Sequence, residues 1–444
     1  MSLSASERRQ APVDVMICGG GSAGFAAAVR AARAGARAVL IEAQSALGGV
    51  WSTTYLAGPS DWRRKTALMR EFEACWEEVT GRPVEQDRWG ETYPWVKDSF
   101  FSSPEWLKVV MERLALAAGV RLRYYTRLVG VEMRAGKTIA AIVTESKSGR
   151  EIWPAEAFVD ATGDGDLGAL AGCGFDIGRP DSGATQPMSL QALITGVHEE
   201  EILPADATTP RKKLIEELKQ AGFETSASGP GLTRLGPGLF KLSTHHAYTG
   251  TGLDADALTR ATVEGRAELA GAVRALRQLG GPWRDVELAA TSPLIGVREG
   301  RRLHGLYTVT RDDLIAGRRH ADAVCRVMFP VDVHSTDPKT HQGYSNEGVA
   351  MQPYDIPLRA LIARDVTNLT MAGRCISGDF YAHASYRVVG NAFATGEAAG
   401  LVAARAALTH RAPADVPFAE LREQLGEVEW PLRREHGADE FKQG

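Results

Sequence analysis

A glycine-rich turn near the start of the chain, flanked by two apolar runs, limits the fold more than any other feature of the sequence. Residues 13–18 form a short apolar run with β-branched side chains, which is typical of a strand buried on both faces. An alanine-rich segment over 22–34 predicts a helix that ends at Gly35, and a second apolar run follows at 38–41. Strand, turn, helix and strand within about 30 residues predict a Rossmann-like α/β unit.

The turn itself has the G-x-G-x-x-G spacing of dinucleotide-binding units. Gly19 permits the tight turn, Gly21 lets the backbone approach a pyrophosphate, and Gly24 lets the helix pack closely against the strand. Ser22 and Ala23, at the start of the predicted helix, are expected beside the same pyrophosphate. The alternative is a glycine-rich turn in another kind of α/β domain.

An acidic residue and a glycine pair narrow the choice of nucleotide. Glu42 follows the second strand, where a ribose 2'-hydroxyl needs an acceptor and a 2'-phosphate would be repelled, so NADP is disfavoured. Gly48 and Gly49 offer a second bare backbone surface shortly afterwards. An NAD domain has no use for such a surface, whereas the longer FAD lies along more of the chain. The sequence therefore favours FAD.

Two later segments agree with this choice. The apolar run before "VDATGDGD" ends in a glycine and aspartate turn, and we expect Ala161, Gly163 and Asp164 beside the cofactor, although a plain surface turn is the alternative. A strand over 368–372, a polar loop and a helix from about 390 to 408 return to cofactor-type sequence. The positive end of this helix could stabilise a reduced flavin. Its small residues, among them Gly396 and Gly400, predict very close packing.

Residues 191–344 differ in character and predict a second, mixed α+β lobe. This region has proline- and glycine-rich loops, an arginine cluster and no further dinucleotide fingerprint. Arg298 is a candidate to bind a substrate carboxylate; the alternative is a structural role for the cluster, with ion pairs to Glu299, Asp312 or Asp313. His334, in "PVDVHSTD", is either a proton donor or acceptor or a structural histidine.

Composition excludes several classes of function. The net charge of -4, without a basic block, argues against a nucleic-acid partner. Five widely spaced cysteines without a C-x-x-C pair argue against a disulfide framework and against a metal site, and favour the cytoplasm. No run of 18 or more apolar residues occurs, so no membrane partner is expected.

Taken together, these segments resemble the FAD-dependent oxidoreductases of the glutathione-reductase-like superfamily, and within them a branch of FAD-dependent dehydrogenases. The resemblance extends from Val13 to about Ala407. It rests on the joint occurrence of "GGGSAG", "LGGVWS", "DATGDGD", "IGVREGRRLHG", "PVDVH" and "AGRCISGDFYAHASYRV".

The resemblance implies a path for FAD along the chain. The pyrophosphate would meet Gly19, Gly21 and Gly24. The other parts of the cofactor would be contacted by Glu42 at the adenosine ribose, Gly48 and Gly49 along the rest of the phosphate path, Val129 near the adenine, Gly163 and Asp164 near the middle of the cofactor, Gly373 to Ser377 (among them Arg374) at the ribityl chain, and His383 to Asn391 (among them Gly390) at the isoalloxazine. The chain departs from the family at Gly378–Tyr381, where threonine, histidine and glutamate are frequent, and at Gly390–Asn391, where proline-threonine is common. Both departures leave the substrate open.

The implied architecture is a discontinuous FAD-binding domain over 12–190 and 345–410, with a helical insertion at about 61–104. The substrate-binding lobe would span 191–344, and a C-terminal tail helix would lie within 411–444.

The resulting expectation is an enzyme that dehydrogenates a small polar or anionic organic substrate by hydride transfer to flavin N5. His383 would move a proton, because its unperturbed pKa lies near the working pH, and Arg387 would hold an anionic group or support the reduced flavin. His334 and Arg298 are second candidates, and a structural role for His383 is the alternative.

Rival flavin chemistries leave other sequence signatures. The chain lacks the C-x4-C dithiol of disulfide reductases, the W-x-W-x-I-P segment of flavin halogenases and a second nicotinamide-binding fingerprint. A monooxygenase reduced transiently by NAD(P)H remains the main enzymatic alternative, and an electron-transfer subunit is the non-catalytic one. An external electron acceptor is required in the dehydrogenase reading, and a homo-oligomer is compatible with the sequence.

Overall fold

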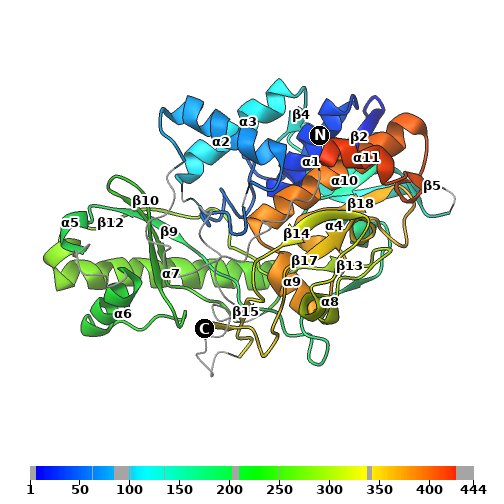
Figure 1. Cartoon of the computed structure of the whole chain (residues 1–444). Coiled ribbons are helices and arrows are strands. Elements are labelled where there is room, and N and C mark those ends of the chain that lie inside the picture. Colours follow the sequence, from blue (N-terminus) through cyan, green and yellow to red (C-terminus); the bar gives the residue numbers. More distant parts are fainter. Residues whose placement is uncertain are drawn as a thin grey trace.

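Two hydrophobic cores organise the protein, a larger one around the nucleotide-binding unit and a smaller one in a second lobe. Figure 1 shows the computed structural model, with the second lobe lying to one side of the nucleotide-binding unit. The structure describes residues 7–62, 64–84, 100, 102–134, 136–202, 210–248, 250–337 and 343–426.

The larger unit is built on an eight-stranded sheet in the order β4-β3-β2-β7-β6-β5, with β1 and β18 also paired to β7. Strands β4, β3, β2, β7 and β18 run parallel, while β5, β6 and the start of β7 form an antiparallel meander. The predicted strands over 13–18 and 38–41 occur with those bounds. The strands are β1 (Arg8–Arg9), β2 (Val13–Cys18), β3 (Ala38–Ile41), β4 (Arg121–Arg123), β5 (Arg127–Arg134), β6 (Thr138–Ser146), β7 (Gly149–Asp160) and β18 (Leu369–Met371).

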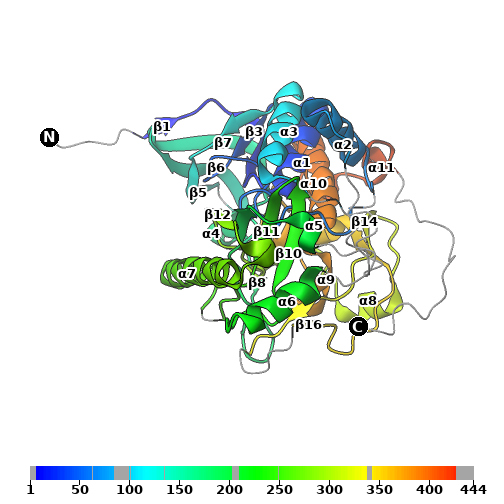
Figure 2. The same ribbon diagram turned by 90° about the vertical axis from the view of Figure 1, so that its left-hand side faces the viewer.

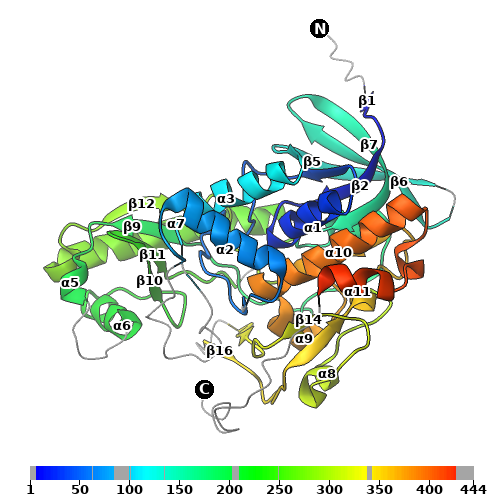
Figure 3. The ribbon, with the colours of Figure 1, turned by 45° about the horizontal axis from the view of Figure 1, so that its top comes forward.

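Helices α1 (Ser22–Arg33) and α10 (Val389–Thr409) pack against the parallel strands and against each other, as Figure 3 shows. A Cβ atom on Gly396 would lie 2.2 Å from the carbonyl oxygen of Ala23, and one on Gly400 would lie 2.1 Å from that of Ala27. Any larger side chain would separate the helices, so the close packing expected of these glycines is confirmed. It brings the start of α10 next to the glycine-rich turn.

Helices α2 (Ala67–Thr80) and α3 (Pro104–Ala117) lie beside α1 (Figure 3). The Thr66 side chain caps α2 by accepting the N–H of Met69, and Gly81 ends it in the left-handed conformation. Part of the insertion predicted at about 61–104 falls on 85–99, outside the described residues. A buried aromatic cluster joins α2 and α10 to the segment after the glycine pair; its members are Trp51, Trp62, Phe72, Trp76, Phe100 and Phe393.

The second lobe consists of a four-stranded sheet in the order β10-β11-β9-β12 with the long helix α7 along it (Figures 1 and 2). Its hydrophobic core runs from Met188 to Ile295, whereas Leu303–Val333 contribute to the first core. The predicted lobe over 191–344 thus contributes to both cores, and its boundaries stay a prediction. The elements are β9 (Ala192–Thr195), α5 (Glu199–Ile202), α6 (Pro210–Gln220), β10 (Gly231–Gly236), β11 (Leu239–Ser243), α7 (Ala255–Leu279) and β12 (Glu287–Thr291).

Shorter elements complete the structure. The predicted tail helix is represented by α11, and residues 427–444 of that prediction lie outside the described residues. In the described parts of the chain, no helix is long and apolar enough to cross a membrane. The remaining elements are α4 (Asp166–Leu170), β8 (Phe175–Asp176), β13 (Arg302–Leu303), α8 (Arg311–Ala316), β14 (Ala323–Val327), β15 (Val333–His334), β16 (Tyr344–Ser345), β17 (Tyr354–Pro357), α9 (Phe380–Tyr386) and α11 (Ala419–Leu425).

Candidate active site

A cavity of about 270 Å³ opens at the carboxyl ends of the parallel strands β2, β3, β7 and β18. This is the general ligand position in open α/β sheets. We call it the first cavity. Predicted site residues that line it are Gly19, Gly21, Ser22, Ala23, Glu42, Gly49, Ala161, Gly163, Asp164, Gly373, Arg374 and Arg387.

The glycine-rich turn forms one wall of the first cavity. Gly19 has a φ of +100°, and a Cβ on it would lie 2.4 Å from the carbonyl oxygen of Ala161. Gly24 is not part of the lining. A Cβ on it would lie 1.8 Å from the carbonyl oxygen of Gly19, so the missing side chain lets α1 pack closely against the turn. Around Gly21, by contrast, a Cβ would meet nothing within 4 Å. Gly24 therefore serves the fold, while Gly21 leaves space for a ligand.

The glycine pair lies directly against this turn. Gly48 donates its N–H to the carbonyl oxygen of Gly20 at 2.8 Å, and a Cβ on Gly49 would lie 3.0 Å from the Cα of Gly21. Gly49 lines the first cavity, whereas Gly48 lies behind it against Ser52. The pair thus extends the bare backbone surface of the turn.

Glu42 closes the end of the first cavity beyond β3. Its Oε2 accepts the N–H of Gly20 at 2.6 Å, and its Oε1 accepts the N–H of Gln44 at 2.7 Å. Burial raises the pKa of this carboxyl, and the two N–H groups oppose the rise. Val129, predicted at the adenine, is 37% exposed and is not part of the lining, although Arg127 from the same strand β5 is.

An ion pair crosses the middle of the first cavity. Arg374 Nη2 lies 2.8 Å from Asp164 Oδ1, and a Cβ on Gly163 would lie 2.7 Å from the same nitrogen. Burial raises the pKa of Asp164, and Arg374 counteracts this. The Nε of Arg374 is buried and has no hydrogen-bond partner among the described residues.

The start of α10 contributes Val389 and Ala392 to the first cavity. Gly390 instead packs against the segment that precedes α2. A Cβ on Gly390 would lie 2.1 Å from the carbonyl oxygen of Asp61 in that segment. Its N–H donates to the oxygen of Ser60 at 3.0 Å. Asn391 is fully buried and its Oδ1 accepts a hydrogen bond from Lys65 Nζ. The predicted flavin contacts of Gly390 and Asn391 stay predictions, and the partners observed here belong to the segment before α2.

The second lobe contributes to the lining of the first cavity. Leu294, Ile295 and Val297 of this lobe supply apolar lining, and Arg387 lines the same cavity. Arg387 Nη2 donates to Asp332 Oδ2 at 3.0 Å and to the carbonyl oxygen of Asp332 at 2.9 Å. The first cavity therefore combines a cation with apolar side chains from the second lobe.

A second cavity of about 160 Å³ lies in this lobe and contains two of the predicted catalytic residues. Arg298 and His334 line it, together with His246 from the segment after β11. Arg298 Nη1 donates to Ser189 Oγ at 2.6 Å and to the carbonyl oxygen of Pro187, and its Nη2 lies 3.3 Å from His246 Nε2. Arg298 is thus held by neutral groups.

The other arginines of the cluster are structural. Arg302 is buried, lies 3.4 Å from Glu299 and donates to backbone oxygens. Arg301 pairs with Asp166 at 2.9 Å. The alternative of structural ion pairs therefore holds for these two, although Asp166 was not among the acids considered and Asp313 pairs with Arg318 instead.

Asp332 connects the two cavities. Its Oδ2 bonds Arg387 of the first cavity and lies 3.4 Å from Nε2 of His334 in the second. Burial alone would raise the pKa of Asp332, but the interaction with His334 and the positive charges of Arg387 and Arg298 outweigh it and hold this pKa well below its usual range. Burial and Arg298 lower the pKa of His334 to about 4. Asp332 is therefore an anion beside a neutral imidazole at neutral pH.

His383 lies in neither cavity lining and is fully buried in α9. Burial and the charges of Arg302, Arg387 and Arg374 hold its pKa well below its ordinary value. The expectation of a pKa near the working pH is therefore wrong for this residue, because the surroundings disfavour the imidazolium. Both ring nitrogens lack hydrogen-bond partners within the described part of the chain.

Comparison with known proteins assigns the family. Residues 14–425 match the family described as FAD dependent oxidoreductase. The chain belongs to this family of FAD-dependent oxidoreductases. It is an enzyme, and FAD is its cofactor. A comparison with curated protein sequences gives no significant match.

Solved structures with a related fold show low sequence identity. A geranylgeranyl bacteriochlorophyll reductase-like protein of Thermoplasma acidophilum is 13% identical, with a TM-score of 0.45 over 90% of this chain and 78% of that chain. The p-nitrophenol 4-monooxygenase of Pseudomonas putida is 9% identical, with a TM-score of 0.44 over 90% and 81%. A myxobacterial chondrochloren halogenase is 12% identical, with a TM-score of 0.48 over 94% and 78%.

The first cavity of this FAD-dependent oxidoreductase fits its cofactor. The open space at Gly21 suits a pyrophosphate, and the carboxylate of Glu42 suits a ribose hydroxyl. The buried Nε atoms of Arg374 and Arg387 lack partners among the described residues. Polar atoms of this kind are costly unless a ligand or water satisfies them.

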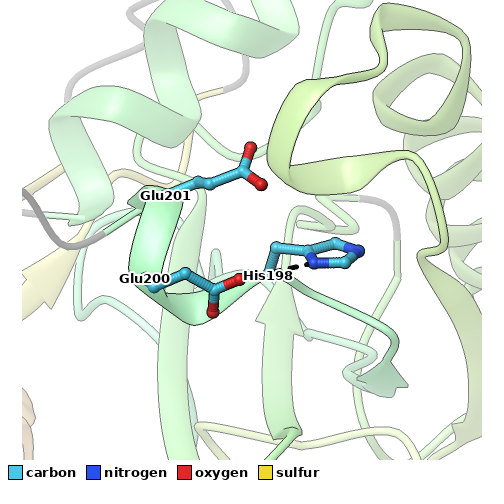
Figure 4. Close-up of side chains that lie close together, drawn as sticks. All are labelled: His198, Glu200 and Glu201. Carbon is cyan, nitrogen blue, oxygen red and sulfur yellow. Dashed lines mark ion pairs between the residues drawn. The ribbon is translucent and has the colours of Figure 1, made fainter.

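A group of metal-type ligands occurs far from both cavities, on the surface of the second lobe. His198, Glu200 and Glu201 have ligand atoms within 4.8 Å of one another (Figure 4). His198 Nε2 already lies 2.8 Å from Asp285, and Glu201 pairs with Arg284 at 2.7 Å. We interpret the group as an exposed ion-pair network.

Two residues at the junction of the cavities, Asp332 and His246, were not predicted from the sequence. Asp332 lies two positions before the predicted His334 in "PVDVH". In an extended segment, residues two positions apart point to the same side, and this spacing was the available signal. His246 had no comparable signal, because its neighbours Arg298 and His334 come from distant segments.

Proposed function

We propose that the protein is a dehydrogenase of the glutathione-reductase-like superfamily. It would oxidise a small polar or anionic organic substrate, with a hydride passing from a substrate C–H bond to flavin N5. Bound FAD supplies the two-electron acceptor. The observation that carries the proposal is the series of contacts from Arg387 through Asp332 to His334, which joins the first cavity to the second.

His334 is the proton acceptor in this proposal. Nε2 of His334 lies 3.4 Å from the ionised Asp332, so we assign the ring proton to Nε2. Nδ1, which has no partner among the described residues, is then free to accept a proton. Since the pKa of His334 is about 4, the ring is uncharged at neutral pH. The proton leaves a substrate O–H or N–H group while the hydride leaves the adjacent carbon, and Asp332 stabilises the imidazolium that forms.

Arg387 and His383 have electrostatic and positioning roles. Arg387 places a cation in the lining of the first cavity, where it supports negative charge on the reduced cofactor. His383 stays uncharged, so it offers hydrogen bonds rather than a proton for the reaction. Leu294, Ile295 and Val297 restrict water in the same cavity, which protects a hydride in transfer.

Anaerobic mixing of the holoprotein with small hydroxy, amino and carboxylic acids tests this function. Flavin bleaching by one of these acids is the expected result, and Arg387→Gln should slow it by roughly 100-fold. Arg260→Gln, on the exposed surface of α7, is the matched control. If the flavin of Arg387→Gln is bleached at the wild-type rate, Arg387 has no role in flavin reduction. Bleaching by NADH or NADPH only when an organic substrate is present would instead assign a monooxygenase.

A further inference from the structure

The second cavity has the size and polarity of a site for a small metabolite. Its volume of about 160 Å³ is below the roughly 300–1,000 Å³ of pockets that hold drug-sized ligands. Three imidazoles, several hydroxyl groups and one guanidinium line it, and no acidic side chain is among its described lining residues. One of its polar atoms, Nδ1 of His334, is buried and has no hydrogen-bond partner among the described residues.

Arg298 presents an unpaired edge at this cavity. Its Nη1 is occupied by Ser189 and Pro187, and one Nη2 hydrogen points to His246. No hydrogen-bond partner is found for the Nε–H in the described ranges of the chain, and one of the two Nη2 hydrogens is also unpaired, so the Nε–Nη2 edge of the planar group can donate further hydrogen bonds. This edge of a guanidinium matches the two oxygens of a carboxylate.

The charges around the cavity favour an anion. The pKa of Arg298, lowered by burial and by Arg387, is still about 10, so this side chain is a cation at neutral pH. Burial lowers the pKa of His245 to about 4 and that of His246 to about 2, so both rings are neutral. The nearest anion, Asp332, is already paired with Arg387. Arg298 is therefore the charged group that a ligand would meet.

We propose that the second cavity binds the carboxylate of a small 2-hydroxy acid, with the Nε–Nη2 edge of Arg298 as its anchor. The proposal rests on the dehydrogenase function proposed above, because the substrate hydroxyl gives its proton to His334 Nδ1 and the adjacent carbon gives its hydride to FAD. The C–O single bond becomes C=O, the product is a 2-oxo acid, and FAD gains two electrons. A 2-amino acid fits less well, since its ammonium group would face Arg298 without an acidic lining residue.

Two connections link the linings of the two cavities. Val297 lines the first cavity and its neighbour Arg298 lines the second. In the other connection, Arg387 of the first cavity is bonded to Asp332, which is bonded to His334 of the second.

Binding of propionate, a carboxylate without the hydroxyl, tests the anchor independently of turnover. Calorimetry on the holoprotein should show binding to the wild type, at least tenfold weaker binding to Arg298→Gln, and unchanged binding to Arg260→Gln. Arg298→Lys, which keeps a donor for Ser189, should fold and bind with intermediate affinity. Equal binding by Arg298→Gln and wild type, or no binding to the wild type, would overturn the inference.

Anaerobic flavin reduction by glycolate, lactate and 2-hydroxybutyrate tests the substrate class. Reduction should occur, and Arg298→Gln should raise the half-saturating concentration at least tenfold with unchanged flavin content; 1,2-propanediol should not reduce the flavin. If propionate binding needs Arg298 but no organic substrate reduces the flavin, the dehydrogenase function fails and the anion site stands. If a substrate without a carboxylate reduces it independently of Arg298, the function stands and this inference fails.

Discussion

The two cavities are built in different ways. The first is formed largely by backbone at the ends of neighbouring parallel strands, with glycines that leave space or permit close approach. The second is lined by residues from six separate segments, which meet only through the tertiary packing of the lobe. A cavity built from backbone leaves a spacing signal in the sequence, while one built from side chains depends on tertiary packing.

The largest effect should come from the glycine-rich turn, where fold and ligand can be separated. Gly24→Ala places a Cβ against the oxygen of Gly19, and such overpacking costs about 1–3 kcal/mol or more. Gly21→Ala has open space and a φ of -63°, so the apoprotein should gain up to about 1 kcal/mol. Both variants should lose FAD affinity.

Urea unfolding of the apoprotein and titration with FAD measure the two properties separately. If Gly21→Ala retains wild-type FAD affinity, the first cavity is not the pyrophosphate site. If Gly24→Ala is as stable as the wild type, the turn tolerates more than its geometry indicates.

The buried histidines of the second cavity should make the free energy of unfolding fall steeply in acid. His245 and His334 have a pKa near 4 in the folded chain and near 6.5 when unfolded, so the unfolded chain binds more protons between these values. The free energy of unfolding should therefore be highest above pH 6.5 and fall as the pH drops toward 4. The slope is at most about 1.4 kcal/mol per pH unit for each imidazole.

His334→Asn removes one of these titrating groups. Its unfolding free energy, measured in urea from pH 7 to pH 4.5, should decline less steeply than that of the wild type. Parallel declines would contradict the depressed pKa of His334.

A smaller and more selective effect is expected at His383. Its two unpaired ring nitrogens are costly in the apoprotein, so His383→Leu should change apoprotein stability by less than about 1 kcal/mol. The holoprotein should lose about tenfold in FAD affinity if the cofactor supplies the missing partner, which corresponds to one charge-neutral hydrogen bond of about 1.4 kcal/mol.

Tyr386→Phe is the matched control for this position. Tyr386 lies edge-to-face with His383 and donates its hydroxyl to the oxygen of Ile376 at 3.0 Å. The Tyr386→Phe variant should have a lower free energy of unfolding and an unchanged FAD affinity. Unchanged FAD affinity in His383→Leu would leave His383 a structural residue.

The smallest effect is expected at Val129. Because the side chain is 37% exposed and lies outside the first cavity, Val129→Ala should change FAD affinity by no more than about twofold. A loss of tenfold in an FAD titration would instead place the adenine against this residue, as the family resemblance implies.

Much of the first cavity could be predicted because its determinants are local. The apolar runs at 13–18 and 38–41 predicted the strand bounds correctly, and the acid after the second strand, Glu42, lines the first cavity as expected of a cofactor contact. The bounds of α10 were predicted within one residue of those observed, since alanines and glycines dominate that segment.

The rest depended on long-range contacts. The pKa of His383 could not be inferred, because Arg302 and Arg374 approach it from other segments. The buried partner of Asn391 is Lys65, more than three hundred positions away in the chain. The connecting role of Asp332 likewise required the position of Arg387, which is set by the packing of α9 and α10.

The central claim is that the two cavities form one active site joined by Asp332. A double-mutant cycle on the anaerobic rate of flavin reduction tests it, with Arg387→Gln, Arg298→Gln and the double variant, using the acid that reduces the wild type best. The account predicts that the two effects are not additive, with a coupling of about 1 kcal/mol or more between residues that share a network. Strictly additive effects would contradict it, because they would show two cavities that act independently.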